Sequence, residues 1–128
     1  MKYLHHKLLV ILILPISIYA SDIYYCVDDD ATGFKTVDDF AVTLFEQEKF
    51  KIMIDFEQNM VKSKDLFFDS HNDPKCVKDT YGVLNCIHIL GGTFIINVNN
   101  LKYYRSAMFR PGASKDDVFI AHGSCEKF

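Results

Sequence analysis

Apolar and polar positions alternate along much of this 128-residue chain. The clearest example is segment 49–56, KFKIMIDF, in which one face would carry Phe50, Ile52, Ile54 and Phe56. Since successive side chains of a strand point to opposite faces, this period of two predicts a half-buried β-strand. Residues 57–59 then read as a turn that leads into a return strand over 60–68.

Further apolar runs predict strands over 23–27, 83–90, 93–98, 101–109 and 117–125. Asn99-Asn100 separates two of them and is typical of a hairpin. Residues 40–45 also alternate as a strand. A helix over 36–45 is the competing prediction there, because Asp38 and Asp39 would suit a first helical turn.

The fold class that follows is all-β. Seven or eight sequential strands with short polar connections favour an antiparallel meander, closed as a small barrel or packed as a two-layer sandwich. Residues 21–128 contain sixteen aromatic side chains, which argue against a single open sheet with one face in water.

The first twenty residues are predicted to lie outside this fold. Lys2 and Lys7 form a basic head, residues 8–18 form a short apolar run, and Ala20 offers a small residue for cleavage. This order is typical of a secretory signal peptide, and the run is short for a permanent membrane anchor. We therefore expect a periplasmic or secreted protein with one β domain, residues 21–128.

The charge of residues 21–128 excludes two classes of partner. Without Lys2 and Lys7 the chain keeps 12 basic and 17 acidic side chains, so its formal net charge falls from −3 to −5. Its basic residues are scattered, whereas a nucleic-acid-binding protein concentrates them on one face. We expect neither nucleic-acid binding nor membrane insertion after cleavage of the signal peptide.

All four cysteines lie in the exported part of the chain. An even number in an exported protein indicates two disulfides. Of the three possible pairings we favour Cys26–Cys125, which ties the ends of the domain together, and Cys76–Cys86, which closes a short excursion. A zinc site is the alternative, but no C-x-x-C pair is present.

An acidic segment, residues 28–39, has the spacing of a calcium-binding loop. Its candidate side-chain ligands are Asp28, Asp30, Thr32 and Asp39, with Gly33 at the position of the tight turn. Two features disagree with that motif: Asp39 replaces the usual bidentate glutamate, and Lys35 replaces an apolar residue. The competing interpretation is a solvated turn over residues 28–33 that leaves the first strand.

Catalytic chemistry has one weak candidate. His122 and Ser124 lie two residues apart on a predicted strand and would share a face, as a small hydrolase would need. The chain lacks the G-x-S-x-G motif that presents a nucleophilic serine, and it lacks a glycine-rich phosphate loop. We expect no catalytic activity and no cofactor.

Binding is the remaining possibility, and aromatic and arginine side chains are enriched at binding hot spots. The candidates are Tyr103, Tyr104, Arg105 and Arg110. Strand alternation sends Tyr103 and Arg105 to one face of the sheet and Tyr104 to the other.

Three short motifs resemble a group of exported bacterial proteins without an assigned function. They are Y-x-C at Tyr24–Cys26, F-K-x-x-I-D-F at Phe50–Phe56 and G-[ST]-C-x-K-F at Gly123–Phe128. The resemblance implies a Gram-negative periplasmic destination and carries no activity or site residues. For the function, we expect a small binding domain of the cell envelope, whose partner is another envelope protein or a small ligand.

Overall fold

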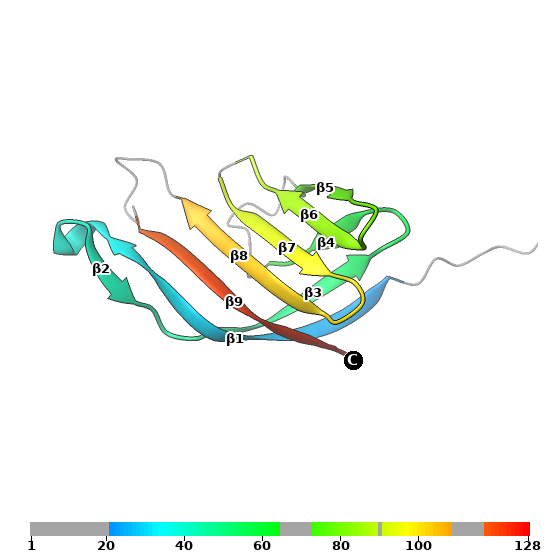
Figure 1. The fold of residues 1–128 in the computed structure, drawn as a ribbon, viewed down its shortest axis with the longest axis horizontal. Coiled ribbons are helices and arrows are strands. Elements are labelled where there is room, and N and C mark those ends of the chain that lie inside the picture. Colours follow the sequence, from blue (N-terminus) through cyan, green and yellow to red (C-terminus); the bar gives the residue numbers. More distant parts are fainter. Residues whose placement is uncertain (1–20, 65–72, 90, 109–116) are drawn as a thin grey trace, which may run out of the picture.

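One antiparallel sheet dominates the computed structural model, which describes residues 21–64, 73–89, 91–108 and 117–128 (Figure 1). Its strands are β1 (Asp22–Lys35), β2 (Ala41–Leu44), β3 (Lys49–Asp55), β4 (Met60–Lys62), β5 (Lys75–Lys78), β6 (Val83–Ile87), β7 (Thr93–Asn97), β8 (Lys102–Met108) and β9 (Val118–Lys127). Eight of them follow the order β4-β3-β1-β9-β8-β7-β6-β5, and β2 pairs with β1 beside this path. The predicted all-β fold is confirmed.

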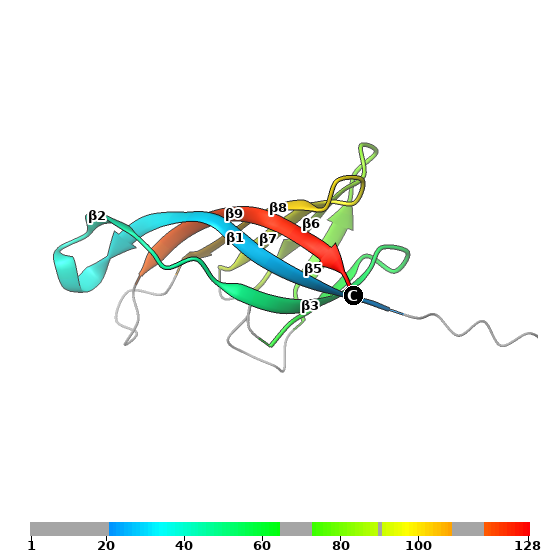
Figure 2. The same ribbon diagram turned by 90° about the horizontal axis from the view of Figure 1, so that it is seen from below.

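The sheet curls until it is nearly closed as a barrel, which was the first of the two predicted architectures (Figure 2). Strands β5 to β9 form the expected meander, while β1 inserts between β3 and β9 and so joins the start of the domain to its end. The barrel remains open between β4 and β5. The side-chain contacts that cross this seam include Lys62 Nζ, 3.4 Å from Asp73 Oδ2, and Lys78 Nζ, which donates to the Phe56 carbonyl at 2.9 Å.

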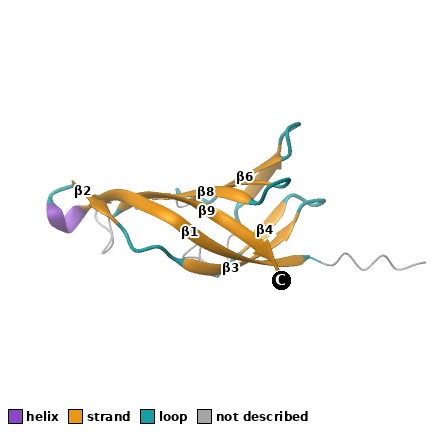
Figure 3. Ribbon diagram, turned by 60° about the horizontal axis from the view of Figure 1, so that its bottom comes forward, coloured by secondary structure: helices purple, strands orange, loops and turns teal. Residues whose placement is uncertain are grey.

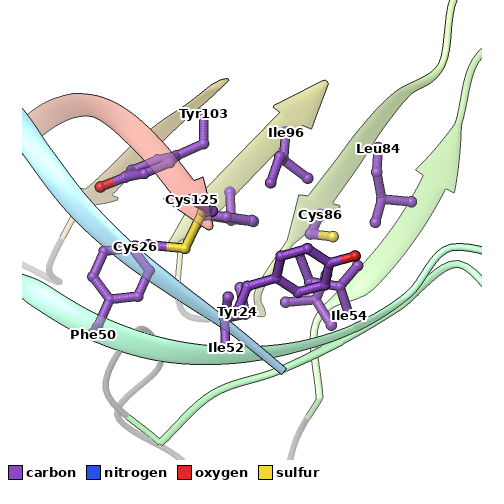
Figure 4. Close-up of a cluster of buried hydrophobic side chains, with 12 residues drawn as sticks. Tyr24, Cys26, Phe50, Ile52, Ile54, Leu84, Cys86, Ile96, Tyr103 and Cys125 are labelled. Atoms are coloured by element: carbon purple, nitrogen blue, oxygen red, sulfur yellow. A yellow bond between two sulfur atoms is a disulfide. The ribbon is translucent and has the colours of Figure 1, made fainter. Parts of the chain in front are cut away.

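Alternate residues of each strand fill the interior, as the sequence pattern predicts. In β3, Phe50, Ile52 and Ile54 are buried, and on β7 the same is true of Phe94 and Ile96. Figure 4 shows Phe50, Ile52, Ile54 and Ile96 in one cluster with the Cys26–Cys125 disulfide. Phe94 belongs to the same cluster. Because apolar burial drives folding in proportion to the area removed from water, this interior is the main source of stability.

Both favoured disulfides are present. Cys26 of β1 lies directly opposite Cys125 of β9, and Cys76 of β5 lies directly opposite Cys86 of β6. Each bond therefore joins neighbouring strands.

The prediction of a turn over residues 28–33 is wrong, because these residues continue β1 to Lys35. The pairing with β9 shifts between Asp28 and Asp30, so that Asp29 is the extra residue of a β-bulge. Because of the bulge, two consecutive aspartates, Asp29 and Asp30, are both exposed. Asp28 before them points inward, and Ala31 after them is buried again.

Residues 36–45 form a hairpin arm and not the competing helix. A short 3-10 turn, η1 (Thr36–Asp38), leads into β2, which pairs with the second half of β1. The chain reverses direction with positive φ angles at Asp39 and Phe40. This hairpin lies at one end of the molecule, with η1 at its tip (Figure 3).

Strands β4, β5 and β6 also differ from the predictions. Strand β4 ends at Lys62, and residues 65–68 of the expected return strand lie outside the described residues. Strand β6 ends at Ile87, since the His88 amide bonds the Gly92 carbonyl in a turn. Strand β5, within the cysteine excursion, was not predicted. Its four residues include two lysines and do not resemble a strand by themselves.

Candidate functional site

A buried ion pair lies on the inner face of the sheet, between β1 and β8. Arg105 donates from Nε to Asp28 Oδ1 at 3.0 Å and from Nη2 to Asp28 Oδ2 at 2.5 Å. Tyr103 Oη donates to Asp28 Oδ1 at 2.7 Å. The carboxylate of Asp28 is fully buried and the Arg105 side chain is 6% exposed, so each charge depends on the other for its solvation.

Small residues on β9 make this contact possible, because β9 lies between the two partner strands. Gly123 stands opposite Asp28 on one side and opposite Tyr103 on the other. A Cβ at Gly123 would lie 2.7 Å from Tyr103 Oη and 2.0 Å from the Val27 carbonyl oxygen. Two residues before Gly123 in β9, Ala121 lies opposite Arg105, and its small side chain leaves room for the guanidinium. The glycine is therefore required where Tyr103 crosses β9 to reach Asp28.

The pair is ionised in the folded protein. Burial by itself raises the pKa of Asp28, but hydrogen bonds from Arg105, Tyr103 and the Glu48 amide outweigh burial and lower this pKa below its usual value. Burial likewise lowers the pKa of Arg105, and the bonds and charge of Asp28 raise it above its usual value. Burial and the Asp28 carboxylate together raise the pKa of Tyr103, which remains a neutral donor.

Segment 45–48 bonds the buried ion pair and ends in a carboxylate that is exposed to solvent. The Glu48 amide donates to Asp28 Oδ2 at 3.0 Å, and the Asp28 amide donates to the Glu48 carbonyl at 3.0 Å. The Glu48 carboxylate, more than half exposed, accepts from Arg105 Nη2 at 2.7 Å. The guanidinium thus bridges one buried and one exposed carboxylate.

Beside Arg105 the inner face opens into a pocket of about 500 Å³. Phe45 and Phe119 form its apolar wall, with ring centroids 5.6 Å apart, and Arg105 lies 4.9 Å from the Phe119 ring centroid. Glu46, Glu48 and Lys35 also line it. The pocket combines apolar walls with side chains of both charges, which suits a ligand that carries an apolar part and charged groups.

The outer face of the hairpin formed by β2 and the second half of β1 is apolar and exposed. Direct register pairs place Phe34 beside Val42 and Thr32 beside Leu44, so these side chains share one face. Ile120 of β9 stands opposite Thr32 and extends this face. The large exposed apolar side chains of the hairpin and of β9 beside it are Phe34, Val37, Phe40, Val42, Leu44 and Ile120.

The calcium candidates do not form a common site in the structure. Asp28 points inward and both of its carboxylate oxygens accept from Arg105, whereas Asp30 and Thr32 are exposed on a strand. Asp39 follows η1 at the tip of the hairpin. Within the described part of the chain, no group of three or more acidic, histidine or cysteine side chains is arranged to hold a metal ion.

His122 and Ser124 share the exposed face of β9, as their spacing predicts. The His122 ring lies between two carboxylates: Nδ1 is 3.8 Å from Asp29 Oδ2 and Nε2 is 3.7 Å from Asp30 Oδ2. Among the described contacts there is no hydrogen bond from His122 to Ser124, which a hydrolase of this type would use to activate its serine.

Three of the four binding candidates separate as strand alternation predicts. Tyr103 and Arg105 are buried in the network above, while Tyr104 is exposed on the outer face, 6.3 Å from the His122 ring. Arg110 lies outside the described residues. Sequence reasoning missed Asp28, Glu48 and Gly123 as the partners of these residues. The small inward residues of β9, Ala121 and Gly123, were the available signal.

Comparison with known proteins adds no relative. No family model matches the chain, and no match was found among curated proteins or solved structures. Within the described residues, no helix has the length and apolar character needed to span a bilayer. The two disulfides are compatible with an oxidising compartment outside the cytoplasm.

Proposed function

We propose that this protein is a non-catalytic binding domain of the cell envelope, exported to the periplasm, and that it binds another envelope protein through the end formed by β1 and β2. The observation that carries the proposal is the set of exposed apolar side chains on this hairpin. Val42 is 75% exposed and Leu44 is 82% exposed, on a short strand at the extremity of the molecule. Clustered exposed apolar side chains mark interaction surfaces.

The buried ion pair supports this proposal as the anchor of the hairpin. Asp28 lies at the bulge from which the second half of β1 extends, and Arg105 fixes it to β8. Segment 45–48, which returns from β2, is held to the same aspartate. The exposed end is thus attached to a rigid base, which favours binding because less conformational entropy is lost.

The alternative to a protein partner is a small ligand that binds in the pocket beside Arg105. The pocket is large enough for one, but the positive charge of Arg105 is already matched by Asp28 and Glu48. Glu46, which lines the pocket together with Lys35, can bind a basic side chain of a protein partner.

Site-specific crosslinking in the periplasm tests the proposal. A photoreactive residue in place of Leu44 is expected to give a discrete adduct with one envelope protein. The matched control is the same residue in place of Val77, which is 69% exposed on β5 away from the hairpin and should not give that adduct. Introducing Phe34→Ser should reduce the adduct at position 44. Equal adducts from both positions, or none from position 44, would contradict the proposal.

A further inference from the structure

The free edge of β2 has the features of a docking strand. Within the described part of the chain, β2 pairs with β1 alone. The Phe45 amide donates to the Ala31 carbonyl at 2.9 Å, which fixes the alternation of the hydrogen bonds along this pair. The peptide groups of Thr43 therefore face β1, and those of Val42 and Leu44 face away from it.

Strand β2 is short, but it lacks the charged residues and prolines that keep many edge strands from pairing. At the barrel seam, β4 carries Lys62 and β5 carries Lys75 and Lys78. In β2 the sequence is Ala-Val-Thr-Leu, with no charged residue and no proline. Unprotected edges are avoided in natural proteins unless another strand covers them.

Charge at this end selects the kind of strand that can approach. Residues 28–48 contain seven acidic side chains and a single basic one, Lys35. A second copy of the chain would bring two such acidic segments together, so self-pairing is opposed by repulsion. A basic partner would be attracted.

We infer that the free edge of β2 accepts an extended segment of a partner protein in which basic and apolar side chains alternate. The segment adds to the sheet as a strand, bonding the outward peptide groups of Val42 and Leu44. Its apolar side chains lie beside Val42 and Leu44 on the outer face. Its basic side chains lie on the inner face, toward Glu46 and Glu48, which line the pocket. This inference rests on the proposed function and specifies its mode of binding.

Model octapeptides test the inference on the oxidised protein. The probe alternates lysine and valine. One control replaces each lysine with glutamate, and a second carries N-methyl groups that block one hydrogen-bonding edge. At a concentration about ten times its Kd, the lysine peptide should slow exchange of the Val42 and Leu44 amides about tenfold. Neither control should do so, and added salt should weaken the binding.

Two matched variants locate the contact. Val42→Lys and Val77→Lys place the same charge on two exposed edge-strand valines at different ends of the molecule. We expect Val42→Lys to lower the affinity for the lysine peptide about tenfold or more, which is equivalent to about 1.4 kcal/mol. Val77→Lys should leave this affinity unchanged.

Three results would overturn the inference: no protection of these amides by the lysine peptide, equal protection by the glutamate peptide, or protection that requires self-association of the protein. If the crosslinked adduct at position 44 still forms, the proposal that the partner binds at the β1–β2 end is retained, and only the inference of strand addition is wrong. If the adduct is absent as well, both proposals fail.

Discussion

At the scale of single residues, Asp28 has the most specific role. It is the first of three consecutive aspartates, and it is the only one of them that is buried. Its sequence neighbours give no sign of this, because its partners Tyr103 and Arg105 lie 75 and 77 positions away.

Replacing Asp28 with asparagine leaves Arg105 buried without its main counter-charge. Removing one partner of a buried pair costs about 3 to 5 kcal/mol of stability. We expect a loss of this size for Asp28→Asn in urea unfolding. Asp30→Asn, at an exposed aspartate, should change the free energy of unfolding by less than about 0.5 kcal/mol. Equal effects of the two substitutions would contradict a special role for Asp28.

The lowered pKa of Asp28 also predicts a pH dependence. Since an aspartate in the unfolded chain titrates near pH 3.9, the unfolded state takes up this proton first as the pH falls. The stabilising contribution of Asp28 is therefore present above about pH 4 and is lost as the pH falls toward the lower pKa of the folded state. Urea unfolding between neutral and acidic pH should show a shallower acid decline in Asp28→Asn than in the wild type.

Gly123 is required because a larger side chain at this position has no room between β1 and Tyr103. In Gly123→Ala the new methyl group would meet Tyr103 Oη and the backbone of β1, so the strands must move apart. Overpacking of this kind costs about 1 to 3 kcal/mol or more. Urea unfolding should show this loss, whereas Ser124→Ala, at the next and exposed position, should be nearly neutral. A neutral Gly123→Ala would show that the close crossing of Tyr103 does not limit stability.

At the scale of elements, β1 combines two functions in one strand. Its first half carries Tyr24 and Cys26 into the core, and its second half, beyond the bulge, pairs with β2. The extra residue at the bulge restores the inward direction at Ala31, which a regular strand would have turned outward.

The strand conformation of this segment predicts that calcium will not stabilise it. Both Asp28 oxygens already accept from Arg105, and Asp30 points to the exposed side. We expect the melting temperature to be the same in millimolar calcium and in a chelator. Magnesium serves as the control for general salt effects. A rise in melting temperature specific to calcium, lost in Asp30→Asn, would restore the calcium-loop hypothesis.

At the scale of the whole molecule, the two disulfides differ in how much of the chain they enclose. Cys26–Cys125 spans 99 positions and Cys76–Cys86 spans 10. The entropy of the unfolded chain is restricted more by the longer loop, so the two bonds should contribute about 4 to 5 and about 3 kcal/mol respectively. Paired serine substitutions followed by urea unfolding measure both values. A larger loss for the shorter loop would show that native-state contacts, and not loop closure, decide the effect.

The sequence by itself determined the all-β class and most of the strands, and it favoured the correct one of three possible disulfide pairings. These follow from local features: alternation of side chains in strands such as Lys49–Asp55, and an even number of cysteines at the ends and in one short excursion. Each can be recognised within a few residues or from the cysteine positions alone.

Only the tertiary structure decided the role of the acidic segment and of the residues around Arg105. Three aspartates before a glycine favour a turn, but pairing with β9 and the buried Arg105 outweigh that local preference and keep the segment in β1. The charge of Asp28 is stable in the interior only because strands distant in sequence bring Arg105 and Tyr103 to it. The same pairing leaves the edge of β2 at the end of the molecule, where the proposed partner would bind.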